Sequence, residues 1–141
     1  MTVLNSKLKD HVVDSYVLDM GTLYFLEHIA IVEFNHGLHI TIESSKPIFS
    51  KIEEYFNHNK FGLIANRVNS YSIHPLDMQR TKEVYPNLGA YAVVATDKAS
   101  KMSAEIENSF CRTHDISFDN LYEAVETVNQ RLSETKKLTI S

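Results

Sequence analysis

The sequence contains a single cysteine, Cys111, among its 141 residues. An internal disulfide is therefore impossible, and a zinc site built from several cysteines is excluded. The chain also lacks long apolar runs, since no stretch approaches the roughly 18 uninterrupted apolar residues of a membrane-spanning helix. Residues 1–10 contain polar and charged groups throughout and no apolar core of a secretory signal. We therefore expect a cytoplasmic protein that does not insert into a membrane.

Glycine is scarce as well. It occupies only four positions, which are Gly21, Gly37, Gly62 and Gly89. The glycine-rich loops that bind nucleotide phosphates cannot be built from this spacing, and the Gly-x-Ser-x-Gly turn of many serine hydrolases is also missing. The sequence therefore predicts no nucleotide cofactor, and nothing else in it points to another cofactor.

Basic residues are outnumbered by acidic ones. The chain carries 14 Lys and Arg against 18 Asp and Glu, which gives a formal net charge of −4. The basic residues are scattered, and the densest pair, Lys136 and Lys137, lies in a polar tail. Such a chain has no basic field to attract nucleic acid or anionic lipid, so we expect neither as a partner.

The composition is otherwise that of a globular protein, with 43% hydrophobic and 23% charged residues. At this length we predict one domain over residues 1–141, with a core of about 12–132 and polar tails at both ends. Hydrophobic alternation, or a short unbroken apolar run, predicts a strand. The segments with these patterns are 12–18, 22–26, 29–34, 61–65, 90–95 and 116–118.

Hydrophobic spacing near 3.6 residues predicts helices between and after the later strands. These segments are 47–57, 74–85, 99–110 and 119–132. Short turns make the first three strands an antiparallel meander, whereas a strand that follows a helix runs parallel to its predecessor. The sequence thus predicts an α/β fold, a mixed sheet with an N-terminal antiparallel meander followed by three βα turns. The predicted core residues are Phe49, Ile52, Phe56, Ile64, Val93, Ile106, Val128 and Leu132.

Several reactive side chains have a plain structural interpretation. His36 and His39 are the closest histidine pair, but no cysteine or further histidine is spaced to complete a tetrahedral site, so we predict no metal. Cys111 lies near Arg112 and His114, and a lone cysteine is most often a small hydrophobe.

Paired carboxylates occur at Glu53 and Glu54 and at Glu105 and Glu107, all on predicted polar helix faces. Such charges are usually solvated. Because no nucleophile–base pair or metal cluster is legible either, we predict that the protein is not an enzyme.

The segment 66–72 is the most informative part of the chain. It follows a buried strand, and the carboxyl ends of parallel strands form the sheet edge that ligands and partners favour. It also precedes a predicted helix, whose N-terminus attracts negative charge. The predicted partner-binding residues are Asn66, Arg67, Asn69, Ser70, Tyr71 and Ser72. In the structural alternative, the asparagines make turn hydrogen bonds and Ser72 caps the helix.

On these residues the chain resembles the STAS family, which has the SpoIIAA-like fold of anti-sigma-factor antagonists. The strings that carry the resemblance are Leu23-Tyr24-Phe25, the segment 66–72 with Pro75, and Phe118-Asp119-Asn120-Leu121. They look like a divergent, largely uncharacterised bacterial branch, and the resemblance covers about residues 12–132. It implies a STAS-like regulator in which a partner kinase phosphorylates Ser70 or Ser72.

Two functions fit these observations. The first is a non-catalytic binding or regulatory module of STAS-like type that recognises a protein partner through the loop 66–72. The second is a small-molecule or lipid-binding domain with a pocket at the same sheet edge. The sequence leaves the identity of the partner open, and also whether the protein forms a homodimer.

Overall fold

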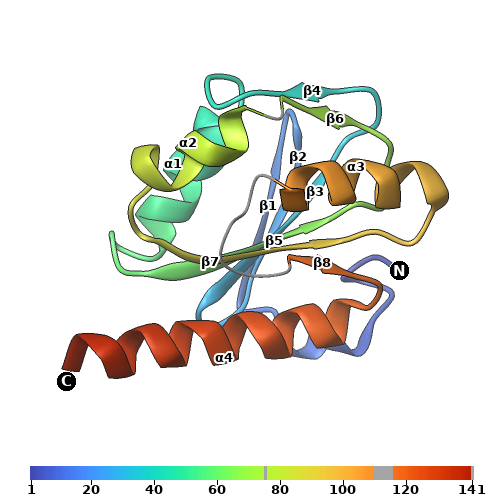
Figure 1. The fold of residues 1–141 in the computed structure, drawn as a ribbon. Coiled ribbons are helices and arrows are strands. Elements are labelled where there is room, and N and C mark those ends of the chain that lie inside the picture. Colours follow the sequence, from blue (N-terminus) through green and yellow to red (C-terminus); the bar gives the residue numbers. More distant parts are fainter. Residues whose placement is uncertain (75, 110–115, 141) are drawn as a thin grey trace.

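The computed structural model describes residues 1–74, 76–109 and 116–140. Its main sheet has six strands in the order β1-β2-β3-β5-β7-β8 (Figure 1). The strands are β1 (Asp14–Leu18), β2 (Gly21–Phe25), β3 (Ile29–Phe34), β5 (Phe61–Asn66), β7 (Leu88–Val94) and β8 (Ser117–Phe118). The first three pair antiparallel, whereas β3, β5, β7 and β8 pair parallel. The predicted mixed sheet, with its antiparallel start and parallel continuation, is confirmed.

Four α-helices are present in the described part of the chain. They are α1 (Lys46–Tyr55), α2 (Asp77–Val84), α3 (Lys98–Ser109) and α4 (Leu121–Ile140). The first three lie on one face of the sheet and α4 lies on the other (Figure 1). Each crossover from β3 onward steps to the next strand in the same direction, and right-handed crossovers then place all connecting helices on one face.

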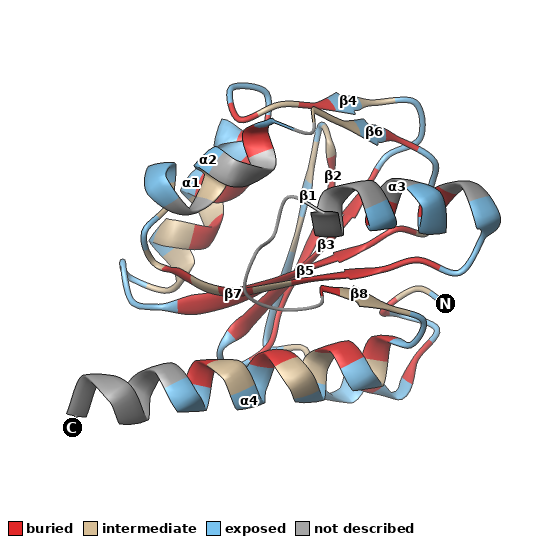
Figure 2. Cartoon of the chain, viewed as in Figure 1, coloured by how far each residue is buried: buried red, intermediate tan, exposed pale blue. Residues whose placement is uncertain are grey.

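The sheet separates two apolar layers, because successive side chains of a strand point to opposite faces. Leu23 and Phe25 of β2 pack with Ile48 and Ile52 of α1, whereas Tyr24 packs in the layer that α4 covers. The central strand β5 is buried along its whole length (Figure 2). Burial on both faces explains its unbroken apolar sequence.

Six of the predicted core residues are buried. They are Phe49, Ile52, Ile64, Val93, Val128 and Leu132. Phe56 is only half-buried, with its ring centre 5.6 Å from that of Phe25 and 5.7 Å from that of Phe61. The side chain of Ile106 lies outside the described residues.

A small parallel sheet, absent from the sequence prediction, pairs β4 (His39–Ile40) with β6 (Ser72–Ile73). The helix predicted from residue 74 begins only at Asp77, and its N-cap position is Leu76. Ser72 therefore lies in a strand and does not cap a helix, so the structural alternative given for Ser72 is wrong. A strand of two residues is too short to show an alternation of apolar and polar side chains, so the sequence does not predict it.

The N-terminal segment is not the polar tail that we predicted. Val3 is fully buried and Leu8 nearly so, and both belong to the layer that α4 covers. The hydroxyl of Ser6 accepts the Leu8 N–H at 3.1 Å at the start of a short 3-10 helix, Lys7–His11. Val3 and Leu8 of this segment are therefore part of the core.

Candidate functional site

The loop after β3 and the loop after β5 lie side by side at the carboxyl edge of the sheet. The Gly37 N–H donates to the Ser70 carbonyl at 2.8 Å, and the Ser72 N–H donates to the Leu38 carbonyl at 2.9 Å. These bonds continue directly into the β4–β6 pairing. Parallel strands end at the same edge, which is why residues about 33 positions apart meet here.

Two predicted partner-binding residues, Arg67 and Tyr71, are buried beneath this loop, with 3% and 7% of their surface exposed. The guanidinium of Arg67 lies 4.2 Å from the ring centre of Tyr71, and its Nη2 donates to the Tyr71 carbonyl at 2.6 Å. The Arg67 N–H donates to the Val94 carbonyl at 2.9 Å. A buried charge needs such partners, and here they hold the shape of the loop.

Asn66 is buried as well, with 2% of its surface exposed. Its side-chain amide donates to Glu33 Oε2 at 2.8 Å and to the Met1 carbonyl at 3.0 Å. The same Glu33 oxygen accepts the Val3 N–H at 2.8 Å. Glu33 and Asn66 thus fasten the N-terminal segment over the carboxyl ends of β3 and β5.

The predicted partner-binding residues that remain exposed are Asn69, Ser70 and Ser72. The side-chain amide of Asn69 donates to the Phe34 carbonyl at 3.0 Å, which ties it to the neighbouring loop. Among the side chains that the structure describes, none forms a hydrogen bond with the Ser70 hydroxyl. The predicted set therefore divides into three buried residues that hold the loop and three exposed residues that a partner can reach.

The small sheet adds histidines to this surface. His39 lies opposite Ser72 in the register, and its Nδ1 is 2.7 Å from Ser72 Oγ. The ring centre of His74 is 6.3 Å from that of His39. The sequence pairs His39 with His36 and not with His74, because no local pattern links residue 39 to residues 72–74.

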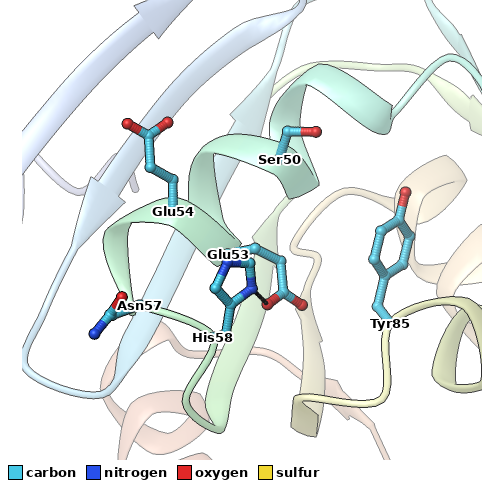
Figure 3. Close-up of a pocket in the computed structure, with 6 residues that line it drawn as sticks. All are labelled: Ser50, Glu53, Glu54, Asn57, His58 and Tyr85. Atoms are coloured by element: carbon cyan, nitrogen blue, oxygen red, sulfur yellow. Dashed lines mark ion pairs between the residues drawn. The ribbon is translucent and has the colours of Figure 1, made fainter.

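A second polar site lies at the opposite, amino edge of the sheet, where α1 and α2 end. It is an open cleft with a volume of about 430 Å³ (Figure 3). The residues that line it are Ser50, Glu53, Glu54, Asn57, His58 and Tyr85.

Glu53 is the least exposed charged group of this cleft, with 15% of its side chain accessible. Its Oε2 accepts from the Asn87 amide at 3.0 Å and lies 3.4 Å from His58 Nδ1. Asn57 and His58 have left-handed backbone conformations (φ 53° and 59°), which end α1 and bring the imidazole to the carboxylate. Burial raises the pKa of Tyr85, and the charge of Glu53 adds to the effect. The predicted solvated helix face is thus wrong for Glu53, whereas Glu54 is exposed.

Within the described ranges, no group of three His, Cys, Asp or Glu side chains is placed to hold a metal ion. In the same part of the chain, no helix is both long enough and apolar enough to cross a membrane. Cys111, Arg112 and His114 lie outside the described residues.

In comparisons with known proteins, no family model, no curated protein and no solved structure matches this chain.

Proposed function

We propose that this chain is a non-catalytic binding module of STAS-like type that recognises a protein partner through the exposed side chains of Asn69, Ser70, Ser72 and His39 and the half-buried side chain of His74. These five residues are termed the carboxyl-edge surface. The observation that carries the proposal is the set of hydrogen bonds that fixes two loops side by side while polar side chains stay accessible. Side chains held in place before binding lose less conformational freedom on binding, which favours affinity.

The sheet topology supports the STAS-like part of the proposal, because the resemblance implies an antiparallel start followed by three βα turns. Between the two candidate phosphorylation sites, the geometry favours Ser70, since the Ser72 hydroxyl already contacts His39. The helix α2 begins at Asp77, so a phosphate on Ser70 would act by adding negative charge to the carboxyl-edge surface rather than through a helix N-terminus.

The contact between Ser72 and His39 resembles the first contact of a nucleophile–base pair. Both side chains are exposed, however, and among the described residues no carboxylate lies within hydrogen-bonding distance of His39. A catalytic base is normally oriented by such a third group. We therefore assign this contact to the positioning of the two side chains.

The alternative of a small-molecule or lipid-binding domain has less support. That hypothesis places a pocket at the carboxyl edge, where Asn66, Arg67 and Tyr71 fill the space beneath the loop. Among the described residues, the cleft of about 430 Å³ opens at the amino edge, and each residue that lines it has a polar side chain.

The proposal is tested by comparing partner recovery with two baits that each gain one negative charge. Ser70→Asp changes the carboxyl-edge surface, whereas Asn129→Asp places the same charge on the exposed side of α4, across the sheet. Both positions are exposed, so both variants should unfold at the denaturant concentration of the parent. Proteins captured from an extract of the native host are quantified by mass spectrometry.

We expect at least one captured protein whose recovery falls about tenfold with Ser70→Asp, which corresponds to about 1.4 kcal/mol of binding free energy. Its recovery should be unchanged with Asn129→Asp. If every captured protein binds both variants as it binds the parent, the carboxyl-edge surface is not the recognition site. The intact mass of the protein isolated from its host then reports separately on phosphorylation.

A further inference from the structure

We infer that His39 and His74 form a binding site for a divalent metal ion of the imidazole-preferring class, such as Ni²⁺ or Zn²⁺. The inference goes beyond the proposed function and does not depend on it. It rests on two observations: two imidazoles lie close together on one small sheet, and a hydrogen bond orients one of them.

The β4–β6 sheet sets the positions of both imidazoles. His39 lies opposite Ser72, and the pairing continues to His74, whose N–H donates to the Ile40 carbonyl at 2.9 Å. Residues two apart on a strand share a face, so His74 lies on the face of Ser72 and therefore of His39. Ile40, which alternates with them, is buried on the other side.

The contact with Ser72 leaves one nitrogen of His39 for an ion. When Nδ1 carries the proton, it donates to Ser72 Oγ across 2.7 Å, and Nε2 keeps its lone pair. Histidines that bind metals almost always hold their other ring nitrogen in such a hydrogen bond, which fixes the tautomer and the ring orientation. In this tautomer His39 has the outer hydrogen-bond partner that is typical of metal-binding histidines.

The rings of His39 and His74 could bind the same ion after a small movement toward each other. Their centres are 6.3 Å apart and their planes are inclined by 32°. Two imidazoles on one ion, with metal–nitrogen bonds of about 2.0–2.1 Å, have ring centres roughly 5 Å apart on a tetrahedral ion and roughly 4.5 Å apart at neighbouring positions of a tetragonal ion. Each ring would move by roughly 0.5–1 Å, which rotation within a side-chain torsional well provides. Because no third protein ligand lies nearby among the described residues, the remaining coordination positions are open to solvent.

The experiment is a calorimetric titration of the full chain with NiCl₂, combined with NMR, in which paramagnetic Ni²⁺ perturbs the amide signals nearest to it. We expect saturable binding and perturbations centred on residues 39–41 and 72–74. Ser72→Ala should weaken the affinity by about tenfold or more, the usual effect of removing an outer partner of a metal-binding histidine. His39→Ala and His74→Ala should weaken it at least as much.

His28→Ala is the matched control, because it removes another exposed histidine just before β3, at the amino edge of the sheet. Its affinity for Ni²⁺ should equal that of the parent. Far-UV circular dichroism checks the fold of each variant, and His39→Gln replaces His39→Ala if the alanine variant unfolds. The inference is overturned if the parent shows no saturable binding. It is equally overturned if both His39 and His74 variants bind as the parent does, or if the perturbed amides lie elsewhere.

Discussion

Replacing Gly62 of β5 with alanine tests how closely α4 packs against the sheet. A Cβ at this position would overlap Val128 Cγ1 and would lie 3.3 Å from Leu132 Cδ1. The strand is paired on both sides and cannot shift, and a β-branched valine has one strongly preferred rotamer in a helix. The helix must therefore move outward. Overpacking of this kind costs about 1–3 kcal/mol, and removal of a strand glycine offsets about 0.5–1 kcal/mol, so we expect a net loss of about 1 kcal/mol.

A second substitution identifies the cause of this loss. Val128→Ala removes the overlapping methyl group and on its own should cost about 2 kcal/mol through lost burial and a cavity. In the double variant the new methyl group of residue 62 occupies part of that cavity. The stability lost by the double variant should therefore be at least about 1 kcal/mol smaller than the sum of the losses of the two single variants. Urea unfolding followed by circular dichroism measures each stability. Additive losses, or a Gly62→Ala variant within about 0.5 kcal/mol of the parent, would refute this account of the packing.

Two further predictions concern the core and the response to acid. Ile64→Ala should lower the free energy of unfolding by about 2–4 kcal/mol, because the side chain is fully buried on β5; a loss below about 0.5 kcal/mol in urea would contradict that burial. At the start of α3, hydrogen bonds from the Ser100 N–H, at 2.9 Å, and from its side chain lower the pKa of Asp97 below its ordinary 3.8. A carboxyl whose pKa is lowered by folding stabilises the protein above its unfolded-state pKa, and this contribution is lost as the pH falls through the folded-state pKa. The urea midpoints of the parent and Asp97→Asn should therefore differ at neutral pH and converge in acid, and a difference that is constant with pH would contradict the assignment.

The main sheet was predictable because its strands carry their own signal. The apolar run of β5 and the spacing of Ile48, Phe49 and Ile52 in α1 record burial directly in the sequence. Hydrophobic burial is the dominant favourable term in folding, so elements that bury the most apolar surface leave the clearest pattern. The β4–β6 sheet buries little and depends on backbone hydrogen bonds between distant segments, which no local pattern records.

The candidate site was predictable in position but not in burial. The sequence places the loop after β5 at the carboxyl edge of the parallel strands. A polar loop at that edge is expected to expose its side chains. Arg67 and Asn66 violate that assumption, because each finds buried partners in a carbonyl group or a carboxylate. A sequence shows that a side chain can form hydrogen bonds, but not whether the fold places a buried partner next to it.

This burial changes how binding data for the loop 66–72 must be interpreted. Arg67→Ala removes the contact that holds the Tyr71 carbonyl, so it alters the shape of the exposed loop and lowers stability together. A loss of partner binding in that variant would therefore not identify Arg67 as a contact. Ser70→Asp leaves the buried hydrogen bonds intact, so a loss of binding at unchanged stability would place the partner at Ser70 itself. The recognition surface is therefore located by variants that lose partner binding while they keep the stability of the parent.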